Sequence, residues 1–288
     1  MTFKHTIHRF TLSLALLALN QVALAKEAPR IISLSPHLTE MVYDLELKEQ
    51  LVATDNFSNY PPEVKDVANV GSGLQPNQEL LLLYKPDIVL SFLPAHHYET
   101  VFDSSTVNVI SSQPESIPAL FADWRKVLVI AQADEKKRLE VEKRIDNTET
   151  QWLELVENYQ DKASKSVFFL ISEQPLYSVS DKAFLSQAIK SCNTQNIFSE
   201  IKLSSFIVNP EELLIKKPDV VIHGYKASHP ESKQESRAII LALFKNLGLN
   251  LQAEQLISVD VDILHRPTLR FINTLPEICA AIHSEIDH

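Results

Sequence analysis

The sequence is poor in glycine and cysteine, and no long apolar run follows its first 25 residues. Its four glycines form neither a GxGxxG nor a GxxxxGK[ST] motif, which argues against a phosphate site built from backbone amides. The GxSxG motif of serine hydrolases is missing as well. Acidic residues (37) outnumber lysine and arginine (27), and the net charge of −10 argues against nucleic acid or an anionic membrane as partner. These absences favour a binding protein over an enzyme.

The first residues have the pattern of a secretory signal peptide. Lys4 and Arg9 precede an apolar run over residues 10–19, and Ala23 and Ala25 suit the positions that a signal peptidase reads. The run is about half of the roughly 20 residues that span a bilayer. An ordinary N-terminal helix is the alternative. We expect a mature chain that begins near Lys26 and is free in the periplasm, since no cysteine near the cleavage site could be lipidated.

Cys192 and Cys279 are the only cysteines. An even count in an oxidising compartment predicts one disulfide, and closing so long a loop is worth about 4–5 kcal/mol in the loop-entropy description. A two-cysteine metal site is the alternative, although no CxxC spacing supports it. The ten histidines include no HExxH or similar pair, so we expect no metal site.

Residues 77–91 align without a gap on residues 209–223, at an offset of 132 positions. Each copy reads as a helix capped by an asparagine (Asn77, Asn209), with a glutamate in the first turn, then a Lys-Pro-Asp turn and an apolar strand. Apolar strands also open both halves, at residues 30–35 and 166–172. The repeat predicts two similar α/β lobes, and a chance likeness of two helix-turn-strand units is the alternative.

Residues 134–160, between the two halves, contain no glycine or proline and place apolar side chains at helical intervals among charges. Asp134 suits the N-cap, and a continuous helix here would be about 40 Å long. Such a stiff connection would limit rocking of the lobes. A solvated surface helix within one domain is the alternative.

Strands and helices alternate along the whole chain, which predicts an α/β fold with parallel sheets covered by helices. The predicted organisation is a signal peptide (1–25), an N-terminal lobe (26–132), a connecting helix (133–161) and a C-terminal lobe (162–288).

Aromatic residues follow several predicted strands, at Phe57, Tyr60, Phe92, Tyr177 and Tyr225. Ligands of α/β proteins bind at these carboxyl ends, and exposed rings there suit a large, flat, partly apolar ligand. Each ring could instead fold back onto the core of its own lobe.

Asp262 and Arg266 follow the last predicted strand, and Pro267 suits the first turn of the next helix. This places Asp262 and Arg266 in a loop, where they could bind amide or phosphate groups of a ligand. A local salt bridge between the two is an equally good interpretation.

Several motifs resemble those of one family, the cobalamin-binding periplasmic proteins of cobalamin ABC importers. They are residues 30–36 with Thr39 and Glu40, residues 59–62, the two Lys-Pro-Asp units, Cys192 followed by residues 196–198, and Cys279. The resemblance spans nearly the whole mature chain. It implies the class III architecture, in which one long helix joins two Rossmann-like lobes, and a monomer that catalyses nothing. Its ligand would be cobalamin or a related corrinoid, with no further cofactor, and its partner a membrane permease.

The resemblance also implies roles for individual residues. Phe57, Phe92 and Tyr177 would surround the corrin, and Asp262 and Arg266 would face its polar edges. Tryptophans of relatives align with Gly73 and Ser205, and Phe206 is a candidate replacement for the second.

Glu79 and Glu211 match the glutamates that dock onto arginines of the permease in this family, and Cys192 and Cys279 match its disulfide. As an alternative to docking, the two glutamates could be simple helix N-terminal carboxylates.

Two other functions fit the sequence. Haem or an iron-siderophore could bind on the same fold. Anionic siderophores usually need several arginines or lysines in the cleft, however, and only Arg266 is an evident candidate for such a cation at the strand ends. A periplasmic enzyme or adaptor is the alternative from a different class.

Overall fold

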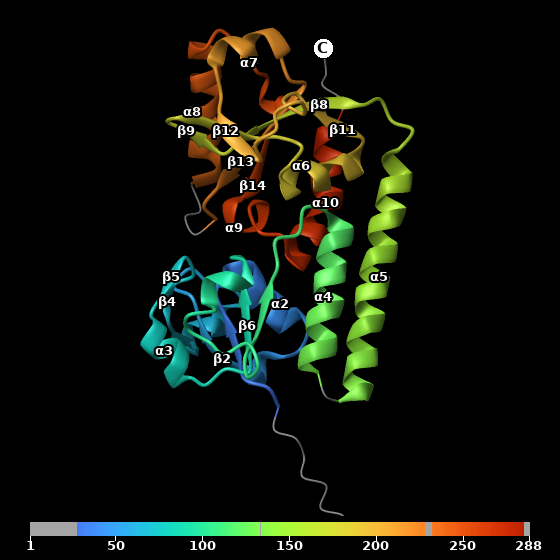
Figure 1. The fold of residues 1–288 in the computed structure, drawn as a ribbon. Coiled ribbons are helices and arrows are strands. Elements are labelled where there is room, and N and C mark those ends of the chain that lie inside the picture. Colours follow the sequence, from blue (N-terminus) through green and yellow to red (C-terminus); the bar gives the residue numbers. More distant parts are fainter. Residues whose placement is uncertain (1–27, 133, 228–231, 285–288) are drawn as a thin grey trace, which may run out of the picture.

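The computed structural model describes residues 28–132, 134–227 and 232–284, so the predicted signal peptide lies outside the described residues. The chain forms two lobes, and helices α4 (Ile117–Ala131) and α5 (Glu135–Tyr159) run antiparallel to each other (Figure 1). Helix α4 lies beside the N-terminal lobe and reaches the boundary between the lobes, whereas α5 continues alongside the C-terminal lobe (Figure 1). In the described ranges, no helix combines the length and the apolar character needed to cross a membrane.

The N-terminal lobe contains a five-stranded parallel sheet whose central strands are buried, as expected for a sheet covered on both faces. The sheet order is β3 (Ala68–Asn69), β2 (Leu51–Thr54), β1 (Ile31–Ser33), β6 (Ile88–Ser91) and β7 (Asn108–Ser111). The lobe also contains α2 (Pro36–Asp44), α3 (Gln78–Leu83), the antiparallel pair β4 (Gly71–Ser72) and β5 (Gln75–Pro76), and 3₁₀ helices at Lys48–Gln50, Pro62–Asp66 and Ala95–Tyr98.

The C-terminal lobe contains a four-stranded parallel sheet and a small antiparallel sheet. The parallel order is β11 (Thr194–Asn196), β8 (Lys165–Leu170), β13 (Val220–Tyr225) and β14 (Leu256–Asp260); the antiparallel order is β12 (Ser205–Ile207), β10 (Leu176–Val179) and β9 (Ser172–Glu173). The helices are α6 (Phe184–Ile189), α7 (Pro210–Lys216), α8 (Ser232–Asn246), α9 (Val261–Leu264) and α10 (Leu269–Ile282), with 3₁₀ helices at Lys190–Cys192 and Ala253–Gln255.

The internal repeat is a structural duplication. Each copy forms a short helix (α3, α7) followed by the strand that pairs with the first strand of its lobe, β6 with β1 and β13 with β8. The Asn77 side chain accepts a hydrogen bond from the backbone of Leu80, and Asn209 accepts one from Glu211, as the capping pattern predicts. The interpretation of the repeat as chance similarity is therefore wrong.

The predicted long helix is α5, capped by Asp134, whose side chain accepts a hydrogen bond from the backbone of Lys137. The helix contacts both lobes. In its first half Arg144 forms an ion pair with Glu46 of the N-terminal lobe, at 2.8 Å. Farther along, Trp152 Nε1 donates to Ser191 Oγ of the C-terminal lobe at 2.8 Å. The interpretation of this segment as a surface helix within one domain is therefore wrong.

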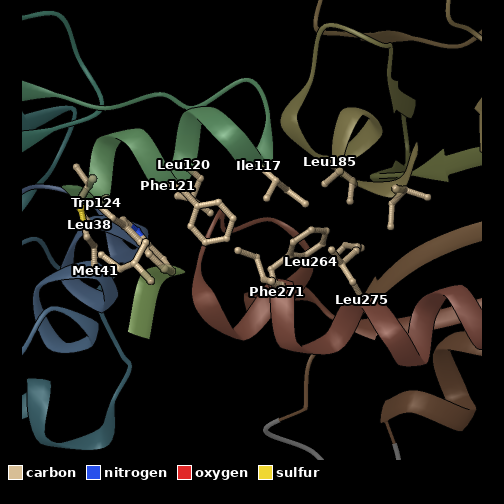
Figure 2. Close-up of a cluster of buried hydrophobic side chains, with 14 of the residues drawn as sticks. Leu38, Met41, Ile117, Leu120, Phe121, Trp124, Leu185, Leu264, Phe271 and Leu275 are labelled. Atoms are coloured by element: carbon tan, nitrogen blue, oxygen red, sulfur yellow. The ribbon is translucent and has the colours of Figure 1, made fainter. Parts of the chain in front are cut away.

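One apolar core crosses the boundary between the lobes. Its side chains come from α2 (Leu38, Met41), α4 (Ile117, Leu120, Phe121, Trp124), α6 (Leu185), α9 (Leu264) and α10 (Phe271, Leu275) and lie in a continuous row in Figure 2. Because α4 packs on both lobes, moving one lobe against the other would open close-packed apolar surface. The lobes are thus joined by a helix pair and a shared core, which limits their relative motion.

The predicted disulfide is present between Cys192 and Cys279. It joins the 3₁₀ helix after α6 to α10, two elements of the C-terminal lobe. The bridge closes a loop of 87 positions, and both of its cysteines are buried in the shared core, so it anchors α10 from within that core.

Candidate ligand-binding cleft

A hollow of about 340 Å³ lies between the lobes at the carboxyl ends of β1, β6 and β7. It is lined by Ser35, His37, Phe92, Gln113 and Pro114 from the N-terminal side and by His265 and Pro267 from the C-terminal lobe. Larger hollows, of about 490 and 660 Å³, lie beside the edge strands β14 and β7. The inter-lobe hollow is the better candidate, because ligands of open α/β sheets bind beyond the carboxyl ends of the strands.

Beside this hollow, Glu40 of α2 binds two arginines of the other lobe. Glu40 is buried, with 2% of its side chain exposed, and its Oε1 lies 3.0 Å from Arg266 Nη1. Arg270 donates from Nε to Oε2 at 2.7 Å and from Nη2 to Oε1 at 2.6 Å, a bidentate pair. A buried carboxylate of the N-terminal lobe thus holds two cations of the C-terminal lobe.

Asn59 and Tyr60 add to this inter-lobe network from the loop after β2. Asn59 Oδ1 accepts from Arg266 Nη1 at 2.7 Å, and its Nδ2 donates to Asp262 Oδ2 at 2.9 Å. The guanidinium of Arg270 lies over the Tyr60 ring, 3.8 Å from its centroid, in cation–π geometry. The loop is therefore tied to the opposite lobe at two successive residues.

Asp262 and Arg266 form a local salt bridge, one of the two interpretations that the sequence allowed, with Arg266 Nη2 2.8 Å from Asp262 Oδ1. The expectation that both lie in a loop is wrong for Asp262, which belongs to the short helix α9. Pro267 also precedes the helix it was expected to start, because α10 begins at Leu269 with Thr268 as its cap. Arg266 lies two residues beyond the end of α9, and this turn brings its side chain back to Asp262, four positions earlier.

The three aromatic residues expected around the ligand occupy different positions. Phe57 is 63% exposed in the loop after β2, and Phe92 lines the inter-lobe hollow. Tyr177 lies in β10 of the small antiparallel sheet, with its hydroxyl 3.4 Å from Ser205 Oγ. The structure thus places Phe92 at the hollow, near the inter-lobe network, while Phe57 and Tyr177 project from separate elements of opposite lobes.

The two positions that the family resemblance matches with tryptophans, Gly73 and Ser205, are small here for different reasons. A Cβ at Gly73 would clash with the carbonyl oxygen of Leu34 and lie 3.5 Å from the Phe92 ring, so no side chain fits the present backbone. Phe206 does not replace the second tryptophan, because its ring packs against Phe198 inside the lobe, with centroids 5.2 Å apart. Alternation along β12 turns Phe206 away from the face of Ser205.

His37 is kept neutral at the wall of the hollow. Burial lowers its pKa from 6.5 to about 4, against a smaller opposing effect of the hydrogen bond to the Ser112 carbonyl. Since a carbonyl oxygen can only accept, Nε2 carries the proton in that 3.4 Å bond, and Nδ1 accepts from Ser35 Oγ at 2.8 Å. His265, on the other wall, also has a lowered pKa, chiefly because of desolvation. Both imidazoles thus contribute no charge to the cleft at neutral pH.

Glu79 and Glu211 are exposed near the starts of α3 and α7, in equivalent positions of the two lobes. The described residues contain no cluster of three or more histidine, cysteine or acidic side chains that could hold a metal ion.

Sequence reasoning missed Glu40, Asn59 and Arg270 as parts of the site. The signal that could have found Glu40 and Asn59 was present, since both belong to the motifs that carried the family resemblance. Arg270 had no such signal, because its partner is 230 positions away in the sequence.

Comparisons with known proteins agree with this architecture. Residues 31–240 match the family described as periplasmic binding protein. The vitamin B12-binding protein of Pectobacterium carotovorum subsp. carotovorum is 31% identical over 200 residues, 68% of this chain and 71% of the relative. That of Vibrio campbellii is 27% identical over 255 residues, 88% of each chain.

Among solved structures, the periplasmic vitamin B12 binding protein BtuF of Vibrio cholerae aligns with a TM-score of 0.71 at 23% identity, covering 88% of this chain and 96% of that one. The periplasmic heme-binding protein RhuT from Roseiflexus sp. RS-1 aligns with a TM-score of 0.67 at 20% identity, covering 89% and 98%. At these identities the two alignments establish the fold. Together with the family match over most of the sequence, they show that this chain belongs to the periplasmic binding protein family.

Proposed function

We propose that this protein binds cobalamin or a related corrinoid in the cleft between its lobes and delivers it to the permease of an ABC importer. It acts as a periplasmic receptor, without catalysis and without a cofactor of its own. The curated relatives named as vitamin B12-binding proteins support the ligand class, and the charge balance of the cleft supports it independently.

The main structural support for a corrinoid ligand is that the arginines of the cleft are already paired with carboxylates. Arg266 and Arg270 bind Glu40 and Asp262, so these four groups sum to zero charge. An anionic siderophore or the propionates of haem would have to compete with buried or half-buried carboxylates for these cations. A corrinoid presents mostly neutral amides at its edge, and such a ligand needs hydrogen-bond partners rather than net positive charge.

Arg266 retains donors for such amides. Its guanidinium has more N–H groups than the three hydrogen bonds to Glu40, Asn59 and Asp262 use. The network fixes the orientation of the guanidinium before a ligand arrives, which lowers the entropic cost of binding. Phe92 at the hollow and the exposed Phe57 supply flat apolar surface for the corrin, with Tyr177 as the third contact.

Delivery requires a surface that the permease can recognise. Glu79 and Glu211 are proposed to dock onto basic residues of two equivalent permease subunits, one from each lobe. The mature receptor, with lobes at residues 26–132 and 162–288 joined by residues 133–161, would act as a monomer. A duplicated receptor with one carboxylate per lobe suits a partner with two-fold symmetry.

Titration calorimetry of the mature protein with cyanocobalamin, haemin and a ferric siderophore tests the ligand. We expect cyanocobalamin to bind with sub-micromolar to micromolar affinity and the two others to bind more weakly. If haemin binds and cyanocobalamin does not, the proposed corrinoid ligand is wrong and haem is the ligand instead.

Phe57→Ala provides the site control. It removes a ring that is mostly exposed, so it should weaken ligand binding while the melting temperature stays unchanged. The same change at Phe198, which is buried in the lobe core, should unfold the protein instead.

A further inference from the structure

Each of the repeat-related helices α3 and α7 carries a large exposed aliphatic side chain one turn after the proposed docking glutamate. Leu83 is 66% exposed and Ile215 is 81% exposed. They are related by the same offset of 132 positions that relates Glu79 to Glu211. Residues four apart lie on the same side of a helix, so each lobe presents one carboxylate and one aliphatic side chain together.

The two helices sit in the same way on their lobes. Leu81 and Leu213, also related by the repeat, are both fully buried and pack into the cores of their own lobes. With these residues turned inward, the glutamate and the aliphatic residue of each helix face outward in equivalent positions. The segments that precede these helices in the sequence also carry exposed aliphatic side chains, since Leu74 after β4 and Ile207 at the end of β12 are 63% and 65% exposed.

Such side chains resemble the core of a protein interface more than an ordinary surface. Interfaces combine an apolar centre with a polar rim, and clustered exposed aliphatic residues mark interaction sites. We infer that Leu83 and Ile215 are apolar anchors, each of which inserts into one of two equivalent sockets on a two-fold-symmetric membrane permease. This inference rests on the proposed function and adds a hydrophobic component to the docking surface.

Charge selects the permease over a second copy of this chain as the partner. The first turns of both helices carry exposed acidic residues, Glu79 in α3 and Glu211 and Glu212 in α7. Two copies meeting through these surfaces would bring carboxylates together, and the chain carries a net charge of −10. A partner with a cation beside each apolar socket satisfies both features of the surface.

The test measures how tightly the mature protein binds the cobalamin importer of the same organism. The importer is reconstituted in nanodiscs, and the protein carries no ligand. Leu83→Ser combined with Ile215→Ser should weaken this binding by about tenfold or more, because two interface anchors are lost. The matched control is Leu139→Ser with Leu153→Ser, which removes aliphatic side chains of 53% and 54% exposure from α5, on the far side of both lobes (Figure 1). The control should bind like the unmodified protein.

Three further measurements separate the possible outcomes. Cyanocobalamin affinity of the docking variant, measured by calorimetry, should equal that of the unmodified protein. If Glu79→Arg with Glu211→Arg abolishes importer binding while the serine variant binds normally, the apolar anchors are refuted and the proposed function stands.

If neither variant changes importer binding, the docking role of this surface fails as a whole. If sedimentation shows that the unmodified protein self-associates through Leu83 and Ile215 and importer binding is unaffected, the inference is also refuted.

Discussion

Glu40 is the residue whose replacement tests the inter-lobe network most directly. Its side chain is 2% exposed and binds Arg266 and Arg270, which are 12% and 21% exposed. Glu40→Gln keeps the shape and one carbonyl oxygen but removes the negative charge. Two largely buried cations then face a neutral amide, and one hydrogen bond to the second oxygen is lost.

The expected cost follows from the burial of these groups. Removing one partner of a buried ion pair costs about 3–5 kcal/mol, because the remaining charge is left uncompensated. Asp262 still balances Arg266, and Tyr60 still covers Arg270. We therefore expect the free energy of unfolding to fall by about 2–3 kcal/mol, which for a chain of this size lowers the melting temperature by several degrees.

Urea unfolding followed by circular dichroism measures the stability, and calorimetry with cyanocobalamin measures the ligand affinity. The matched control is Glu46→Gln. This residue forms an ion pair with Arg144 at 2.8 Å, but both partners are more than half exposed. Exposed pairs contribute about 0–1 kcal/mol, so the control should lose little stability and no affinity.

The affinity distinguishes a positioning role from a purely structural one. If Glu40 orients Arg266 for the ligand, Glu40→Gln should weaken cyanocobalamin binding at temperatures well below the unfolding transition. Equal losses of stability for Glu40→Gln and Glu46→Gln would refute the argument from burial. A stability loss with unchanged affinity would show that the network holds the lobes but does not prepare the cleft.

Three other changes have defined outcomes. Gly73→Ala should lower the free energy of unfolding by about 1–3 kcal/mol because its Cβ clashes with the backbone of Leu34. Differential scanning calorimetry should show a smaller loss for Gly224→Ala, because its Cβ would sit 3.2 Å from the Val261 side chain, a tight contact rather than an overlap. Because folding lowers the pKa of His37 from 6.5 to about 4, the unfolded chain binds more protons between these values and stability falls as the pH drops through them. His37→Gln should remove about 1–2 kcal/mol of the stability difference between about pH 7 and pH 5 in urea titrations, and an unchanged pH profile would contradict the neutral assignment. Phe92→Ala should weaken cyanocobalamin binding about tenfold or more in calorimetry, and an unchanged affinity would exclude the inter-lobe hollow as the site.

Local patterns in the sequence determined the elements of this fold. Asparagine caps at residues 77 and 209, the aspartate cap at residue 134 and the helical spacing of apolar residues predicted α3, α7 and α5, because such signals act over a few neighbouring residues. The offset of 132 positions predicted two lobes, and a pair of cysteines predicted the disulfide between Cys192 and Cys279.

Only the tertiary structure decided how the cleft is built. The contacts of Glu40 with Arg266 and Arg270 join residues 226 and 230 positions apart, and no local pattern encodes which buried carboxylate meets which cation. The same holds for Phe206, whose side of the strand depends on register, and for Gly73, whose lack of a side chain is required by the backbone of Leu34. These features arise where separate elements pack together, because packing and charge pairing depend on three-dimensional proximity rather than on sequence neighbours.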